Sequence, residues 1–279
     1  MAVPKDPDPS QSLRVMLGSE LRHARLEAGL SQEAVGEPLF VSGSYIAKLE
    51  NGTRRMPHEM ACQFDEMFST NGFFARNCVV ANRSKYPDHF AEAADAEAIA
   101  TKIKQYAPLL IPGLLQTEDY ARAVFRAHHP TATDEAINRL VTARMERARI
   151  LGDPATPLVW MVLDEAALRR QVGGAGVMAR SIQHMAKLAR ANRVIVQVLP
   201  FAAGCHAAME GLLKLMSFED APPLSYIEGP GAGHLEDDPA TVARHELTYQ
   251  LITASALPPR ESLVLIESVA EEYGNEAQL

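Results

Sequence analysis

The stretch LRHARLEAGLSQEAVGEPLFVSGSYIAKLENGTRR, residues 21–55, decides how the first part of the chain folds. Ser31 and Ser42 each precede an apolar run and are suited to cap the two helices that follow them. Pro38 lies between these helices and lacks an amide donor, so the helix before it should end there. Apolar side chains recur at helical spacing across and just before the stretch: Leu17, Leu21, Ala24, Ala28, Ala34, Val35, Ile46 and Leu49.

Two further signals complete the pattern. Gly52 can end the third helix in a left-handed cap, and Pro57 suits the first turn of a fourth helix over 57–68. Two short helices joined by a tight turn and flanked by two more form a helix-turn-helix unit, whose second helix enters the major groove of DNA. The sequence therefore predicts an all-α domain over 13–69, preceded by a flexible, polar and proline-rich tail over 1–12.

Residues 17–68 resemble the XRE-type, phage-repressor-like DNA-binding domains. The matching segments are Leu30-Ser31-Gln32, Val35, Ser42, Ile46 and Leu49-Glu50-Asn51-Gly52. The resemblance implies a lambda-repressor-like fold and a buried ion pair between Arg25 and Glu50. It also implies a DNA-binding surface, in which Gln32 bonds a phosphate and helix three faces the groove. This surface comprises Gln32, Ser42, Gly43, Ser44, Tyr45, Lys48, Arg54 and Arg55.

Three features depart from that family. Phe40 stands where the turn usually has glycine; a positive φ there would cost about 1 kcal/mol, so we expect a reshaped turn. Gly43 has no side chain to offer a base. Residues 1–70 carry seven cations and ten anions. Phosphate contacts supply most non-specific affinity, so we expect weak binding by one copy and useful affinity from a homodimer. The alternative is a four-helix bundle with no role at DNA.

The length of the chain, 279 residues, allows two domains. Its formal net charge is −8, so contacts with double-stranded DNA must be local. Cys62, Cys78 and Cys205 are widely spaced and odd in number, which argues against a disulfide framework and a zinc site. There is no apolar run of 18 residues and no signal peptide at the start. These features predict a cytoplasmic protein that contacts no membrane and carries neither metal nor cofactor.

Residues 70–105 are predicted to form a helical connector, with one helix over 73–86 and a second over 90–104. Beyond it, Pro108 and Pro112 exclude a continuous helix. The apolar residues near these prolines should be buried: Leu109, Leu110, Ile111, Leu114 and Leu115. A helix over 134–151 carries Arg139, Arg144, Arg147 and Arg149 away from its apolar face. We interpret these arginines as a solvated face, with a basic patch as the alternative.

The spacing of apolar residues changes after residue 157. Short apolar runs over 158–164 and 194–200 are typical of buried strands, and 212–218 with 224–228 should form a hairpin. Amphipathic helices are predicted between and after the strands, over 175–191, 239–255 and 259–273. Residues 106–279 therefore read as an α+β domain, in which helices cover a small sheet. The whole chain is multidomain, with an all-α helix-turn-helix domain followed by this α+β domain.

Four segments of the second half resemble one actinobacterial family, the XRE regulators of the WhiJ-like type: PGLLQTEDYARA (112–123), VLDEAALRRQVGG (162–174), VQVLPFAAGCH (196–206) and ALPPRESLVLI (256–266). The C-terminal domain of these regulators has no settled biochemical function. The resemblance implies a transcriptional regulator whose second domain senses a small-molecule effector or binds a partner. The alternative is an antitoxin-like protein that neutralises a small BldB-like partner, with DNA binding secondary.

Several groups of polar residues are candidates for chemistry. Cys205 next to His206 suggests a thiol nucleophile, but adjacent residues point apart, so we predict no catalytic residue and no enzyme. His234, Glu236 and Asp237 could bind a metal, but Asp238 beside them suits a helix cap better. Asp164 and Glu165 are expected to cap and charge a short helix, and the glycines over 173–176 form only a weak phosphate-loop pattern.

A ligand pocket is the more plausible site in the second domain. Clefts form at strand ends, and five side chains fall at or beside such ends. They are Trp160, Phe201, His206, Tyr226 and Glu228. The alternative for Trp160 and Tyr226 is a place in the core.

Overall fold

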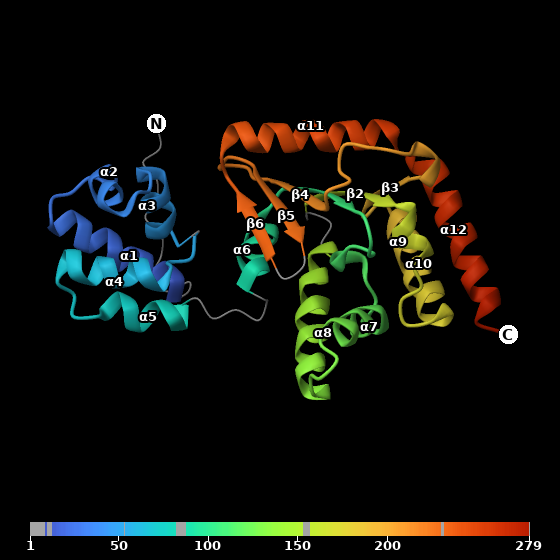
Figure 1. Cartoon of the computed structure of the whole chain (residues 1–279), viewed down its shortest axis with the longest axis horizontal. Coiled ribbons are helices and arrows are strands. Elements are labelled where there is room, and N and C mark those ends of the chain that lie inside the picture. The colour runs from blue at the N-terminus through green and yellow to red at the C-terminus, as the bar shows by residue number, and fades with distance from the viewer. Residues whose placement is uncertain are drawn as a thin grey trace. The chain divides into compact units, whose positions relative to one another are not determined.

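The computed structural model describes residue 9 and residues 13–52, 54–81, 88–152, 157–229 and 232–278. The chain divides into two compact units, residues 1–84 and 85–279 (Figure 1). The predicted tail over 1–12 lies outside the described residues, apart from Pro9.

The first unit is a bundle of helices, as the sequence predicted. Its elements are α1 (Leu13–Glu27), α2 (Gln32–Gly36), a 3-10 turn η1 (Glu37–Leu39), α3 (Gly43–Glu50), α4 (His58–Phe68) and α5 (Phe73–Ala81). The two predicted caps are confirmed, because the Ser31 hydroxyl accepts from the Ala34 amide at 3.1 Å and the Ser42 hydroxyl from the Tyr45 amide at 3.2 Å. The core joins all five helices through Leu17, Leu21, Val35, Ile46, Leu49, Met56, Ala61, Phe64, Phe74, Cys78 and Ala81.

The turn of the motif keeps its usual geometry, so the expectation that Phe40 would reshape it was wrong. Phe40 lies in the left-handed region with φ 56° and ψ 35°. The left-handed residue lets the Val41 amide reach the Gly36 carbonyl at 3.1 Å, and a Cβ on Gly36 would lie 2.4 Å from the Val41 carbonyl oxygen. The Phe40 side chain is 97% exposed, so backbone hydrogen bonds rather than packing of this side chain offset the strain of its left-handed conformation.

The second unit is built on a six-stranded mixed sheet, and its α+β class agrees with the prediction. The strand order is β3-β2-β1-β4-β5-β6; β1, β2 and β3 are parallel and the other neighbours antiparallel. The strands are β1 (Lys102–Ala107), β2 (Leu158–Asp164), β3 (Ile195–Leu199), β4 (Leu212–Ser217), β5 (Leu224–Gly229) and β6 (Ala232–Glu236). The predicted hairpin is the β4–β5 pair.

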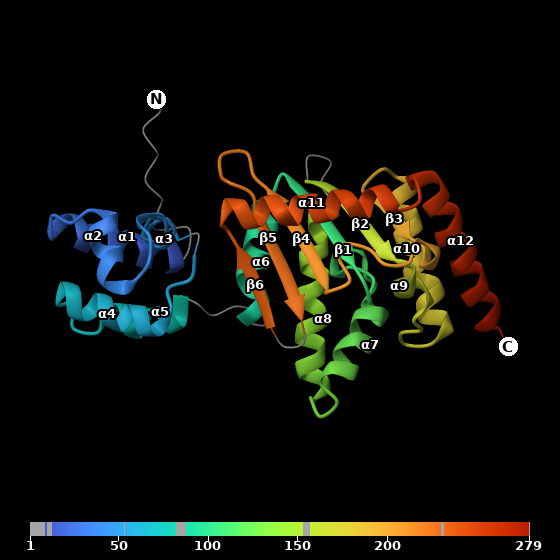
Figure 2. The same ribbon diagram turned by 45° about the horizontal axis from the view of Figure 1, so that its top comes forward.

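Helices cover both faces of this sheet (Figures 1 and 2). They are α6 (Asp88–Ile99), α7 (Glu118–His128), α8 (Asp134–Ala148), α9 (Glu165–Arg169), α10 (Ala175–Arg190), α11 (Pro239–Ser255) and α12 (Pro259–Glu276), with 3-10 turns η2 (Gly113–Leu115), η3 (Arg149–Gly152) and η4 (Phe201–Ala203). Helix α11 alone crosses one face, where Tyr249 and Ile252 pack on Tyr106, Val162 and Leu213. The larger core lies on the other face, against α6, α10 and α12.

The connector prediction misplaced one strand. The helix expected over 90–104 ends at Ile99, and β1 begins at Lys102. Polar and apolar side chains alternate only over Lys102, Ile103 and Lys104, which is too short to show the period of two of a strand. Strand β1 lies in the sheet between β2 and β4. Part of the expected helix over 73–86 also lies outside the described residues, since α5 is described to Ala81.

Two smaller expectations also failed. Leu109 and Leu110 are 54% and 37% exposed, because they lie in the loop before η2, whereas Ile111, Leu114 and Leu115 are buried as predicted. Strand β6 was not predicted at all. It is an edge strand without an apolar run, so its sequence carries no strand signal.

Candidate nucleic-acid interface

The second helix of the motif, α3, has one buried side and one accessible side. Ile46 and Leu49 are buried in the bundle core. Ser44 is exposed, and Tyr45 and Lys48 are partly exposed. Lys48 lies three residues after Tyr45 and four after Ser44, a spacing that brings its side chain next to both on the helix surface. The Ser42 cap fixes where this helix begins. The accessible side therefore carries hydroxyl, phenol and ammonium groups next to one another.

Gly43 does not belong to that accessible side. It is buried, and a Cβ on it would lie 2.5 Å from the Glu33 carboxylate oxygen of α2. The resemblance gave Gly43 a place facing the groove; here the absence of a side chain lets α2 pack closely on the start of α3. Glu33 is exposed and holds its carboxylate over the N-terminus of α3, where the helix dipole favours negative charge.

Arg54 lies beside the far end of α3. Its backbone amide donates to the Lys48 carbonyl at 3.2 Å, and its guanidinium group stacks on the Tyr45 ring, 4.3 Å from the ring centre. Arg55 follows it and is also partly exposed. The stacking reduces the rotamer freedom of Arg54 and holds its charge close to Tyr45 and Lys48.

A buried polar group ties α1, α2 and α3 together. Arg25 binds Glu50 through two nitrogens, at 2.5 and 3.1 Å, and donates to the Leu30 carbonyl at 2.9 Å. The hydrogen bond to Glu50 raises the pKa of Arg25 above its ordinary value. This is the ion pair that the resemblance implies. The Gln32 side-chain amide also donates to Glu50, at 2.8 Å, through one of its two N–H groups, and the phosphate contact that the resemblance implied stays a prediction.

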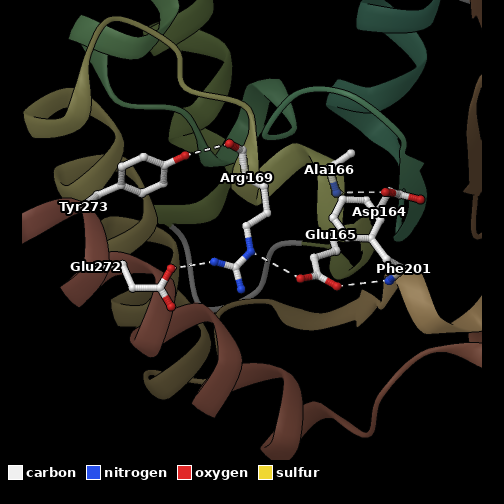
Figure 3. A network of polar contacts seen from close by, with 7 residues as sticks. All are labelled: Asp164, Glu165, Ala166, Arg169, Phe201, Glu272 and Tyr273. Atoms are coloured by element: carbon white, nitrogen blue, oxygen red, sulfur yellow. Dashed lines mark hydrogen bonds and ion pairs between the residues drawn. The ribbon is translucent and has the colours of Figure 1, made fainter. Parts of the chain in front are cut away.

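In the second unit, Asp164 and Glu165 serve structure, as predicted. The Asp164 carboxylate accepts from the Ala166 amide at 2.8 Å and caps α9. Glu165 accepts from the Phe201 amide at 3.0 Å and pairs with Arg169, which also reaches Glu272 of α12 (Figure 3). Together with the Tyr273 hydroxyl, which donates to the Arg169 carbonyl at 2.8 Å, these bonds join α9, η4 and α12.

The five residues predicted to line one pocket do not come together. Trp160 lies beside Met161 in β2 and so on the opposite face of the sheet from it, and the register places Tyr226 and Glu228 on the Met161 face. Tyr226 is 1% exposed and packs on Phe90, so it belongs to the core. Phe201 is exposed on η4. The sequence could not group these residues correctly, because it shows where strands end but not on which face of the sheet each side chain lies.

The sheet instead assembles a cluster that the sequence did not predict. The Tyr106 hydroxyl lies 3.2 Å from Asp164 and 3.3 Å from Nε2 of His206. Burial, together with the Asp164 charge, raises the pKa of Tyr106. Nδ1 of His206 accepts from the Ala208 amide at 3.3 Å, so His206 holds its own loop. Only the register of β1 with β2 brings Tyr106 to Asp164, and no local signal could have found the cluster.

The remaining constellations have structural roles. Asp238 caps α11 by accepting from the Thr241 amide at 2.9 Å, as predicted. His234 lies 3.5 Å from Glu236. Within the described parts of the chain, no three His, Cys, Asp or Glu side chains gather as metal ligands would, and no helix has the length and apolar character needed to cross a bilayer.

Two arginines of α8 correct the prediction of a solvated face. Arg139 and Arg149 are exposed, but Arg144 and Arg147 turn toward the sheet. The Arg147 side chain is only 10% exposed and lies 3.1 Å from the buried carboxylate of Glu97. Periodicity alone could not distinguish the two pairs, because a buried carboxylate on a distant helix decides which arginines face inward.

Comparison with known protein families follows the division into two units. Residues 16–71 match a family described as a helix-turn-helix domain, which covers the bundle of the first unit. Residues 90–268 match a family described as a domain of unknown function, DUF5753, and this match spans more than half of the chain. No curated protein and no solved structure matched the chain. The chain thus belongs to the DUF5753 family and carries a helix-turn-helix domain ahead of the family domain.

Proposed function

We propose that the protein is a DNA-binding transcriptional regulator that uses α3 as its recognition helix. The observation that supports this most is the division of α3 into a buried side with Ile46 and Leu49 and an accessible side with Ser44, Tyr45 and Lys48. A recognition helix needs such a division, since one side must hold the fold while the other meets base edges and phosphates. Arg54, stacked on Tyr45, extends the cationic part of this side.

The small number of cations limits the affinity that one copy of the proposed interface can have for DNA. The accessible side of α3 offers few cations, and the chain carries a formal charge of −8. Affinity for DNA comes largely from neutralised phosphates. We therefore propose that the regulator binds an operator as a homodimer, which doubles the phosphate contacts, and that its DUF5753 domain has a sensory or partner-binding role. The alternative of an antitoxin-like protein with a small BldB-like partner stays a prediction, because nothing in the described residues identifies such a partner.

The test uses the full chain with both cations of the interface removed, Lys48→Ala with Arg54→Ala. Genomic DNA that co-precipitates with the protein is sequenced first, and a fragment shared by the precipitates serves as the probe. Two lost phosphate contacts should lower the slope of log affinity against log salt by about 1.8, at roughly 0.9 per contact. Binding is measured by mobility shift between low and moderate salt.

Arg139→Ala is the matched control, because Arg139 is an exposed arginine of the second unit. It should leave both the affinity and the salt slope unchanged. If the double variant binds the fragment as tightly as the parent protein, with the same slope, α3 is not the DNA-binding element.

A further inference from the structure

A cluster of charged groups lies between α6, α8 and the sheet of the second unit. At its centre is Glu97, which is 1% exposed. Its carboxylate forms ion pairs with Lys214 of β4 and Arg147 of α8. Although burial opposes ionisation, the charges of Lys214 and Arg147 lower the pKa of Glu97 below its ordinary value. One ionised carboxylate thus serves two cations.

A third cation, Arg144, lies one turn before Arg147 on α8. One nitrogen of its guanidinium group donates to the Gln116 side-chain oxygen at 2.8 Å, and the group stacks over the Phe125 ring at 4.3 Å. Gln116 is itself buried and held by the Ile111 carbonyl at 2.7 Å. Among the residues that the structure describes, none places a carboxylate within ion-pair distance of Arg144, so its direct partners are an amide and a ring.

The surroundings of Arg144 are short of negative charge. Burial, and then the neighbouring charge of Arg147, lower the pKa of Arg144 to about 10, while Glu228 and Glu97 oppose this only in part. Taking a cation out of water costs several kcal/mol unless an opposite charge compensates it. A guanidinium group in this position would gain from a bound anion.

The guanidinium groups of Arg144 and Arg147 both come close to the backbone at Gly113. A Cβ on Gly113 would lie 2.3 Å from Nη2 of Arg147 and 3.6 Å from Nε of Arg144. Both guanidinium groups therefore reach the same bare stretch of backbone, which no larger residue could occupy without displacing Arg147. Gly113, Arg144 and Arg147 all stay partly accessible to solvent.

We propose that Arg144 and Arg147, beside the bare backbone of Gly113, bind the oxyanion of a small effector, a carboxylate or a phosphate group. Guanidinium groups bind such anions through two parallel hydrogen bonds, and among the described residues only one nitrogen of Arg144 has a hydrogen-bond acceptor. As an effector site, this inference rests on the proposed function; as an anion site, it does not.

The experiment measures thermal unfolding of the full chain without DNA. The chain has one tryptophan, Trp160 of β2, so its fluorescence reports the second unit. The probes are sodium phosphate and sodium acetate, each compared with sodium chloride at equal ionic strength. At a probe concentration about ten times its dissociation constant, the midpoint should rise by roughly 3 °C. A rise with phosphate alone identifies a phosphate site, and a rise with acetate also identifies an oxyanion site that takes carboxylates.

Variants on α8 show whether the rise comes from this site. Arg144→Gln should abolish it, Arg144→Lys should weaken it because the planar fork is lost, and Arg139→Gln should keep it in full. Gly113→Ala should reduce it by displacing Arg147. The proposal is overturned if neither probe raises the midpoint of the parent protein above chloride, or if Arg144→Gln and Arg144→Lys both respond as the parent does. Because no DNA is present, this result is independent of whether α3 binds an operator.

Discussion

At the scale of single residues, glycine and charge at the start of α3 govern how the motif can meet DNA. Gly43 lets α2 approach, and the approach brings the exposed Glu33 carboxylate over the α3 N-terminus. That position suits the helix dipole but opposes an incoming phosphate. The same acidic side chain therefore favours the free fold and should disfavour the proposed complex with DNA.

Replacing this carboxylate should strengthen DNA binding. Glu33→Gln removes one negative charge near the phosphates and keeps the size of the side chain, so affinity at low salt should rise about threefold, the size of one Coulomb term in a largely aqueous setting. The gain should shrink as salt is raised, because exposed charges are screened. Fluorescence anisotropy with a labelled DNA duplex measures both effects.

Glu66→Gln is the control for that variant, since Glu66 is an exposed glutamate on α4. It should change affinity much less. Equal gains from both variants would mean that only the net charge of the chain matters and that Glu33 has no special place.

Single residues also show what a sequence can reveal. Ser31 and Ser42 were predicted as caps because a cap depends on residues three positions away. Arg144, Tyr106 and Gly43 were misjudged or missed, because their roles depend on side chains brought from distant segments. Phe40 was misjudged for another reason: the tight return of Val41 to Gly36 requires a left-handed residue whatever its type.

At the scale of elements, one carboxylate of α4 caps the first turn of α5, in addition to the apolar core that the two helices share. Asp65 of α4 accepts from the Phe74 and Ala75 amides at 2.9 and 2.8 Å, and from the Thr70 hydroxyl. These amides belong to the first turn of α5, whose donors have no partner within the helix. Burial raises the pKa of Asp65, but the hydrogen bonds from Thr70, Ala75 and Phe74 together outweigh it, so the pKa is lower than its ordinary value.

Asp65→Asn should destabilise the first unit by about 1–2 kcal/mol at neutral pH, because an amide has one acceptor oxygen and leaves the Phe74 or the Ala75 amide without its partner. Because the pKa of Asp65 is lower in the folded state, its contribution is fully present above the unfolded value near 4 and is lost as pH falls through the lower, folded value. The difference between parent and variant should therefore shrink below about pH 4. Circular dichroism melts at pH 7 and pH 3 measure it, with exposed Glu66→Gln as control. A difference that is the same at both pH values would contradict this role for Asp65.

The strands of the second unit were predicted unequally, and the reason is their composition rather than their position, since β3 is an edge strand and β1 an inner one. Strands β2 and β3 are apolar apart from Asp164 and Gln197, because helices cover both faces of the sheet there. Strand β1 has Lys102, Lys104 and Gln105 within six residues, and edge strand β6 has no apolar run. Their pairing is a property of the whole sheet, and the sequence pattern therefore predicted four strands of six.

At the scale of the whole molecule, the chain divides into two compact units, each with its own core. A unit with its own core is expected to unfold as a cooperative body. The single tryptophan allows the unfolding of the two units to be followed separately. Trp160 lies in β2 of the second unit, whereas helices of both units contribute to circular dichroism. The two signals should therefore respond differently to a substitution in each unit.

Glu97→Gln is the substitution for the second unit. It leaves Lys214 and Arg147 buried without their carboxylate, which should cost about 3–5 kcal/mol and lower the midpoint of the Trp160 fluorescence transition by roughly 10 °C. Asp65→Asn should leave that fluorescence midpoint unchanged while it lowers the circular dichroism transition of the first unit. If either variant shifts both transitions together, the two units unfold as one body, and a substitution in one cannot be used to test the function of the other in isolation.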